Sequence, residues 1–137
     1  MKVLGLDLGN RTLGMAVSDF LGIIANPIGT MRFEDGDLEK ALEYTKEAIK
    51  EHNVEKLVLG LPKNMNGSIG PQAEYCLKFK EMLENETKLE VVMIDERLTS
   101  KQADVIMLSA DLSRQKRKKN VDKLAAAIIL QTYLDRR

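Results

Sequence analysis

The sequence has too little cysteine, histidine and tryptophan for several kinds of functional site. Its 137 residues include one cysteine, Cys76, one histidine, His52, and no tryptophan. One cysteine excludes an internal disulfide. A lone histidine and a lone cysteine in different predicted helices argue against a transition-metal centre or a Cys–His nucleophile. We interpret Cys76 as a core residue and His52 as a helix C-terminal residue favoured by the helix dipole.

Long apolar runs are also absent. No stretch approaches the roughly 20 apolar residues that a membrane-spanning helix needs. The chain enters a strand-like pattern at Val3 without the basic start of a secretion signal. The shortage of cysteine fits a reducing compartment. We therefore expect one domain over residues 1–137, located in the cytoplasm and without a membrane partner.

The net charge of zero hides a strong asymmetry along the chain. Residues 1–96 carry 11 basic and 17 acidic residues, whereas residues 97–137 carry 10 basic and 4 acidic ones. A chain polarised in this way can present a basic face although its charges cancel in sum. Runs of charge are usually solvated surface, but this one is also the obvious candidate for binding the phosphates of a nucleic acid. The candidate phosphate-binding residues are Arg114, Lys116, Arg117, Lys118, Lys119 and Lys123.

Hydrophobic patterns predict a mixed α/β fold. Strands are expected at residues 3–8, 12–18, 23–30, 57–61 and 89–94. Helices are expected at residues 38–52, capped by Asp37, at 72–85, from Thr99 to about Ala110, and from about Val121 to Leu134. The first three strands form an antiparallel meander, with the third at the edge because Pro27 cannot donate to a ladder. Later strands follow helices, which favours parallel pairing in a five-stranded sheet flanked by helices on both faces.

Acidic residues on three separate segments are candidates for catalysis. Asp7 ends the first strand, Asp95 and Glu96 follow the fifth, and Asp122 lies beside the apolar stripe of the last helix. Asp7 could instead accept turn amides, Asp122 could cap its helix, and Asp95 or Glu96 could pair weakly with Arg97. Ligands gather at the carboxyl ends of parallel strands, so we expect the carboxylates to converge. Oxygen ligands suit one or two Mg²⁺ or Mn²⁺ ions, which activate water for phosphodiester hydrolysis.

Further basic and amide side chains are candidates for binding nucleic acid. Residues 62–71 form a loop that is long for a plain connector and rich in turn residues. It supplies Lys63, Asn64 and Asn66, while Arg11 and Arg97 lie next to the acidic positions. With three phenylalanines and three tyrosines, base stacking is not expected to dominate. Binding should therefore be mainly ionic and should weaken steeply with salt.

Four motifs resemble those of the YqgF (RuvX) family, in order and nearly end to end. They are Gly5–Gly9 with Leu13–Asp19, Gly60–Gly67, Asp95–Thr99, and Asp122–Gln131. The resemblance implies an RNase H-like fold related to the RuvC resolvases. It also implies that Asp7, Glu96 and Asp122 bind the metal and catalyse hydrolysis, with Asp95 as an alternative second ligand. The implied activity is maturation of the 5′ end of precursor 16S ribosomal RNA, or resolution of Holliday junctions.

One position departs from the wider fold. Many RNase H-like enzymes carry an acid at the end of the fourth strand, where this chain reads Leu59-Gly60-Leu61-Pro62. The second acid must therefore come from Asp95 or Glu96, which leaves the number of metal ions open.

Two other classes of protein stay open at this point. A phosphotransferase or ATPase of the actin and sugar-kinase type has a related core, but 137 residues leave no room for its second large domain. A non-catalytic nucleic-acid-binding module could keep the fold, although the intact set of carboxylates argues against it. The sequence does not distinguish a monomer from a homodimer. A junction resolvase would benefit from a dimer, since two strands must be cut.

Overall fold

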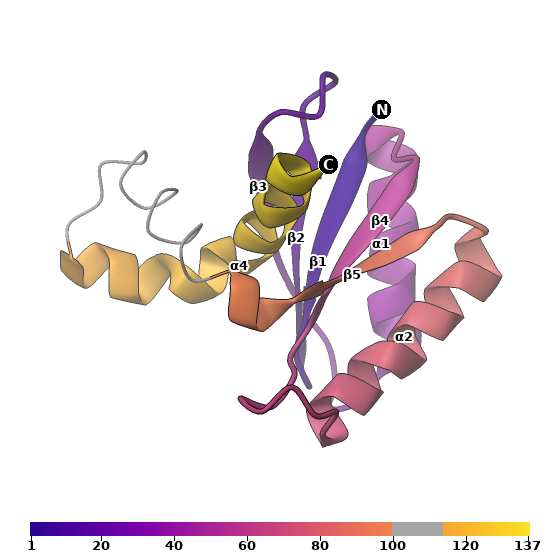
Figure 1. Cartoon of the computed structure of the whole chain (residues 1–137). Helices are drawn as coiled ribbons and strands as arrows, with labels where there is room; N and C mark the ends of the chain where they lie inside the picture. Colours follow the sequence, from indigo (N-terminus) through magenta and orange to yellow (C-terminus); the bar gives the residue numbers. More distant parts are fainter. Residues whose placement is uncertain (100–113) are drawn as a thin grey trace.

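The computed structural model describes the backbone of residues 1–99 and 114–137, and the side chains of residues 1–99 and 124–137. The described strands are β1 (Val3–Leu8), β2 (Thr12–Ser18), β3 (Ala25–Arg32), β4 (Lys56–Leu61) and β5 (Val91–Asp95). The described helices are α1 (Leu38–His52), α2 (Pro71–Thr87) and α4 (Arg114–Arg136). A short 3-10 turn, η1 (Glu96–Leu98), follows β5 (Figure 1).

The strands form one mixed sheet in the order β3-β2-β1-β4-β5 (Figure 1). The first three pair antiparallel as a meander, and β4 pairs parallel with both β1 and β5. The predicted arrangement of strands is therefore confirmed. β3 lies at the sheet edge, where Pro27 faces Ala16 beside a shift in register. This position tolerates proline because the missing N–H leaves no inner ladder bond unmade.

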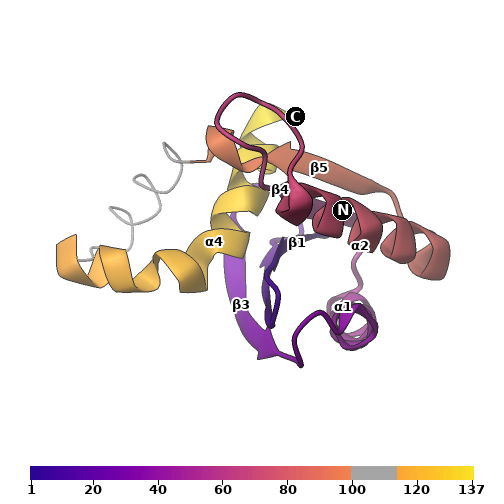
Figure 2. The same cartoon turned by 90° about the horizontal axis from the view of Figure 1, so that it is seen from below.

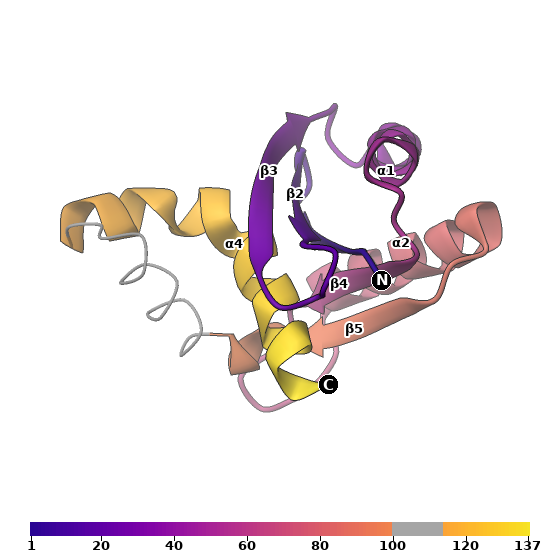
Figure 3. The same ribbon diagram turned by 90° about the horizontal axis from the view of Figure 1, so that it is seen from above.

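Alternation along the strands divides the core into two layers. Leu4 and Leu6 of β1 pack in the layer that contains Phe79 of α2 and the inner face of α1. Val3 of β1 packs in the layer that contains the apolar face of α4. Figures 2 and 3 show α1 and α2 on one side of the sheet and α4 on the other. Successive side chains of a strand point to opposite faces, so Asp7 shares the α4 face with Val3.

Gly5 allows α4 to pack directly on the centre of the sheet. A Cβ atom at this position would lie 2.6 Å from Cβ of Leu130 and 2.9 Å from the carbonyl oxygen of Ala126. Either the helix or the strand would have to move to accept it, because cores are packed close to crystal density. The absence of a side chain at Gly5 therefore sets the distance between α4 and β1.

We expect Gly5→Ala to lower the free energy of unfolding by about 1–3 kcal/mol, the usual cost of overpacking a core. Urea unfolding followed by circular dichroism measures the change. Gly14→Ala is the matched control, because a Cβ there would meet its nearest atoms at 3.6–3.8 Å, which is ordinary contact. Equal stability of the two variants would contradict the close packing of α4 on β1.

Several predicted boundaries are confirmed at the residue level. β1, β2 and α1 span the predicted residues, and Asp37 caps α1 by accepting a hydrogen bond from the backbone N–H of Lys40 at 3.2 Å. The other predicted strands and α2 are found with their ends displaced by a few residues. No helix in the described part of the chain is long and apolar enough to span a membrane.

The predicted start of the last helix near Val121 is wrong. α4 begins at Arg114, so the basic run is helical. Lysine, arginine and glutamine favour helices, but this run has no apolar residues that would show a helical period. The helix predicted from Thr99 to about Ala110 lies outside the described residues, apart from Thr99 itself, which follows η1.

Candidate active site

Asp7 and Glu96 lie at the ends of two strands, β1 and β5, that are not neighbours in the sheet. Asp7 is the penultimate residue of β1, Glu96 begins η1 directly after β5, and β4 lies between those two strands. All three strands run parallel, so their carboxyl ends meet at the same edge of the sheet. Both acidic residues are half-buried there. This is the edge at which parallel α/β sheets bind their ligands.

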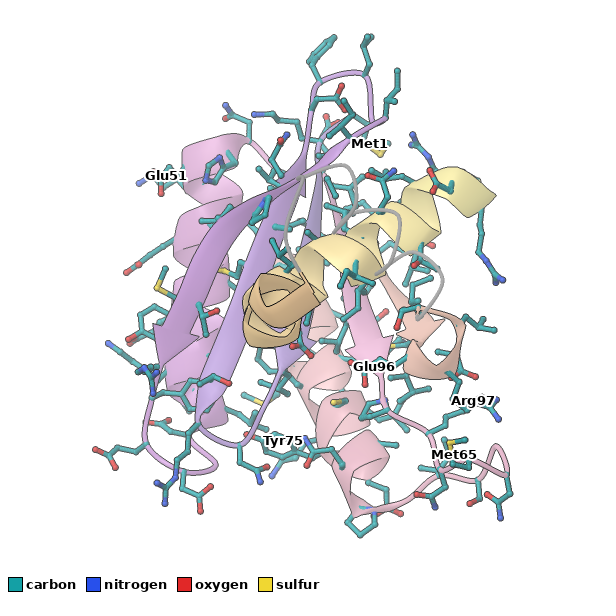
Figure 4. The ribbon with its side chains drawn as sticks, turned by 90° about the vertical axis from the view of Figure 1, so that its left-hand side faces the viewer. Met1, Glu51, Met65, Tyr75, Glu96 and Arg97 are labelled. Atoms are coloured by element: carbon teal, nitrogen blue, oxygen red, sulfur yellow. The ribbon has the colours of Figure 1, made fainter. Side chains whose placement is uncertain are left out.

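Gly60 of β4 provides the space in which the two carboxyl groups meet. A Cβ atom at Gly60 would lie 2.7 Å from Oε1 of Glu96 and 2.6 Å from Cδ1 of Ile129. The Glu96 carboxyl therefore lies over the backbone of β4, in a space that any side chain at this position would fill. From there it hydrogen-bonds to Asp7. Figure 4 shows Glu96 at this end of the sheet.

The close approach of the two acids changes the protonation of Glu96. Burial, the charge of Asp7, the hydrogen bond to Asp7 and the charge of Asp95 together raise the pKa of Glu96 from 4.5 to about 7. Two carboxyl groups hydrogen-bond to each other only when one of them keeps a proton. The pair therefore holds a proton near neutral pH that a divalent cation would replace.

The free energy of unfolding should fall as the pH rises from the ordinary pKa of glutamate to about 7. Between the ordinary pKa of glutamate and about 7, the unfolded chain has released a proton that folded Glu96 still holds. The unfolded chain then binds fewer protons, so the free energy of unfolding decreases with rising pH. Because the carboxyl is partly exposed, we expect a loss on the order of 1 kcal/mol after solvent screening. Urea unfolding in EDTA at pH 5 and pH 8 measures it, and Glu96→Gln should flatten the difference.

Cys76 lies close enough to Glu96 and Asp7 for their charges to affect the pKa of its thiol. The thiol is buried in the α1–α2 layer. Burial raises its pKa to about 12, with smaller contributions from Glu96 and Asp7. The thiol therefore stays protonated at neutral pH and behaves as a core residue, which agrees with the sequence-based interpretation.

The two adjacent acids of the third motif have different partners. Oδ1 of Asp95 accepts the backbone N–H of Arg97 at 3.0 Å. Its two oxygens also accept Nε of Arg97 at 3.0 Å each, and Oδ2 accepts Nη2 at 2.6 Å. Hydrogen bonding to Arg97 lowers the pKa of Asp95. Thus Glu96 faces Asp7, whereas Asp95 is occupied by an arginine.

The side chains of Asn64 and Asn66, expected to contact nucleic acid, make hydrogen bonds within their own loop. Nδ2 of Asn64 donates to Oγ of Ser68 at 3.0 Å. Oδ1 of Asn66 accepts the backbone N–H and the hydroxyl of Ser68 at 3.0 and 2.6 Å. These bonds give the loop a defined shape, which was not predicted although asparagine and serine are typical turn formers. Arg11 is exposed in the β1–β2 turn and Lys63 is half-buried at the start of the loop.

Asp122 belongs to α4, but its side chain lies outside the described residues. It precedes Ala126 by four residues, which is one helical turn. A Cβ atom at Gly14 would lie 3.6 Å from Cβ of Asp7 and 3.7 Å from Cβ of Ala126, so this part of α4 packs close to Asp7. The side chains of the basic run also lie outside the described residues, namely those of Arg114, Lys116, Arg117, Lys118, Lys119 and Lys123. Among the described residues no group of three acids, histidines or cysteines is placed to hold a metal ion.

Comparisons with known proteins agree with the fold and the motifs. A family model described as "RuvX: Holliday junction resolvase" matches residues 1–136. A protein of Bacillus mycoides named "Putative pre-16S rRNA nuclease" is 48% identical over 135 residues, which cover 98% of each chain. A protein of Bacillus subtilis with the same name is 47% identical over 135 residues, also 98% of each chain.

Solved structures show the same fold at low sequence identity. Thermus thermophilus RuvC in complex with a Holliday junction substrate has a TM-score of 0.69 at 14% identity, covering 100% of this chain and 95% of that one. The fowlpox virus Holliday junction resolvase has a TM-score of 0.58 at 12% identity and covers 100% of both chains. A Thermus thermophilus ROK hexokinase has a TM-score of 0.53 at 24% identity, but only 38% of that chain is covered. The predicted RNase H-like fold is thus confirmed, and the match of the family model over almost the whole chain shows that the protein belongs to the RuvX family.

Proposed function

We propose that this protein is a metal-dependent nuclease that hydrolyses phosphodiester bonds in precursor 16S ribosomal RNA. The observation that carries the proposal is the meeting of Asp7 and Glu96 over Gly60, which places two carboxyl groups at the ligand-binding edge of the sheet. Relatives that are nearly half identical over 98% of the chain are named putative pre-16S rRNA nucleases, which supports this choice of substrate. We propose that the protein carries out this reaction in the cytoplasm.

Asp7 and Glu96, together with Asp122, would hold one or two Mg²⁺ or Mn²⁺ ions. The donors fit such ions, because all are carboxylate oxygens. The raised pKa of Glu96 fits as well, since it reflects negative charge that a cation would balance. When bound, the ion supplies an activated water and stabilises charge on the phosphate. Asp122 is proposed as the third ligand because its position is one helical turn from Ala126, beside Asp7.

The protein's own residues would orient the substrate over this pair. The basic half of α4, with Lys63 and Arg11 at the same end of the sheet, would hold the phosphate backbone by charge. The side chains of Asn64 and Asn66 make hydrogen bonds to Ser68 within the loop. Their proposed role is therefore to hold the loop in its shape. Exposed groups of the loop would make any contact with nucleic acid.

A second candidate substrate is a four-way DNA junction. The observation that favours it is the description of the matching family as a Holliday junction resolvase. Two strands of a junction must be cut, so this function would call for a homodimer with both sites on one substrate. A monomer would suffice for trimming a single RNA strand.

A side-by-side cleavage assay tests the proposal. Purified protein with Mg²⁺ or Mn²⁺ is incubated with precursor 16S RNA and with a synthetic four-way junction, and its oligomeric state is measured on the same sample. We expect cleavage near the 5′ end of the mature sequence and little cutting of the junction. Symmetric cutting of the junction by a dimer would favour the resolvase function. Tight binding of either substrate without any cleavage would point to a non-catalytic module.

A further inference from the structure

Arg97 ties the turn that carries Glu96 to the loop between β4 and α2. Besides its three side-chain contacts with Asp95, its Nη1 donates to the carbonyl oxygen of Met65 at 3.3 Å. A Cβ atom at Gly67 would lie 3.3 Å from the same Nη1, so the loop backbone closes over the guanidinium. Figure 4 shows Arg97 directed toward the loop that carries Met65 and away from Glu96.

The turn on the other side of this contact is held at both ends. Asp95 accepts the backbone N–H of Arg97 and so caps the start of η1. At its end, the hydroxyl of Thr99 donates to the carbonyl oxygen of Glu96 at 2.7 Å, and the Thr99 backbone N–H donates to the same atom at 3.2 Å. The backbone of Glu96 therefore has little freedom while the Asp95–Arg97 pair is intact.

The loop is equally well ordered by its own bonds. The backbone N–H of Asn64 donates to the carbonyl of Ser68 at 3.0 Å, and that of Gly67 donates to the carbonyl of Asn64 at 2.8 Å. With the side-chain bonds around Ser68, these make residues 64–68 a closed unit. The Arg97 guanidinium joins this unit to the Glu96 turn, so the two should move together.

We propose that Asp95 and Arg97 form a positioning pair, which fixes Glu96 over Gly60 by locking η1 to the loop at residues 64–68. The proposal rests on the function assigned to Glu96 above and extends it. It gives Asp95 and Arg97 roles other than metal ligand and phosphate binder. Arginine is required because its planar fork reaches both carboxylate oxygens and a carbonyl at once, which an ammonium group cannot do.

Four variants separate the positioning role from the two alternatives. If the pair positions Glu96, Arg97→Ala and Asp95→Asn each lower kcat by about 10- to 100-fold, the usual effect of removing a group that orients a metal ligand. The double variant is no worse than either single variant, because both remove the same interaction. KM for RNA stays near the wild-type value, and Arg97→Lys does not restore kcat.

The alternatives predict different patterns. If Arg97 binds phosphate directly, Arg97→Ala should raise KM and Arg97→Lys should restore it. Asp95→Asn should then strengthen RNA binding, because it frees the guanidinium. An Asp95 that binds the metal would lose Mn²⁺ affinity in Asp95→Asn while Arg97→Ala keeps it. Either pattern would overturn the proposal. Lys78→Ala, which removes an exposed lysine from the outer face of α2, is the charge-matched control for Arg97→Ala.

A second measurement is independent of activity. Hydrogen exchange of the backbone amides of Asn64, Gly67 and Ser68, and Mn²⁺ titration of the RNA-free protein, are compared across the variants. Positioning predicts faster exchange and weaker Mn²⁺ binding to a similar extent in Arg97→Ala and Asp95→Asn. Unchanged exchange and unchanged kcat in both variants would overturn it.

The failure of this proposal is distinguishable from failure of the proposed function. If Glu96→Gln abolishes cleavage while Arg97→Ala and Asp95→Asn behave as wild type, the positioning pair is refuted and the nuclease site survives. If Glu96→Gln cleaves normally, the assigned site itself is wrong.

Discussion

Asp7→Asn is expected to abolish RNA cleavage while leaving RNA binding close to the wild-type level. The carboxylate of Asp7 meets Glu96 at the edge of the sheet, and losing one of the proposed metal ligands would remove several kcal/mol of charge stabilisation. A loss of that size corresponds to a rate decrease of roughly 10³-fold or more. Single-turnover cleavage with enzyme in excess measures the rate, and a filter-binding titration measures the affinity.

The same variant should separate metal binding from folding. Mg²⁺ at about 100 times its Kd should stabilise the wild-type protein by about 2.7 kcal/mol and should not stabilise Asp7→Asn. Without metal, Asp7→Asn should unfold at a higher temperature than wild type, because it relieves the repulsion that raises the pKa of Glu96. Glu81→Gln, which changes an exposed acid on α2, is the matched control. If Asp7→Asn cleaves RNA at the wild-type rate, Asp7 is not part of the active site.

Gly60→Ala is expected to inactivate the enzyme although no acidic residue is substituted. Its Cβ atom would lie 2.7 Å from Oε1 of Glu96, so the carboxyl must leave the space over β4. Displacing a catalytic group by about 1 Å can cost roughly 10²-fold in rate, so we expect a loss of at least that size. Cleavage kinetics and Mn²⁺ titration should both show the defect.

Gly14→Ala is the appropriate control for this variant. It also adds a methyl group close to an acidic residue, at 3.6 Å from Cβ of Asp7, but this is ordinary contact that displaces nothing. We expect it to keep a near-normal cleavage rate. If Gly60→Ala is fully active, the path of Glu96 across β4 is not needed for the reaction.

The sequence predicts the sheet well because its strands carry strong local signals. Pro27 identifies the edge strand, and the helices between later strands favour parallel pairing, and the structure confirms both. The start of α4 was predicted seven residues too late, because the basic run lacks the apolar period from which helices are read. Stretches without apolar residues are where pattern-based boundaries are least informative.

The choice between Asp95 and Glu96 shows what the sequence contained and what it did not. Val92 and Ile94 pack on the α4 face, so the alternation of β5 favours Glu96 for the same face as Asp7. That signal is present in the sequence, but using it requires knowing which face α4 covers. The bidentate contact of Arg97 with Asp95, and the space above Gly60, depend on distances between segments far apart in the chain. No local pattern contains them.

Anomalous diffraction from crystals soaked in Mn²⁺ tests the central claim most directly. We predict a peak about 2.1 Å, the distance of a directly bound ligand, from carboxylate oxygens of both Asp7 and Glu96, and its loss in crystals of Glu96→Gln. A Mn²⁺ ion bound by Asp95 and not by Glu96 would contradict the account. So would the absence of a peak at this edge of the sheet, if protein from the dissolved crystals cleaves RNA.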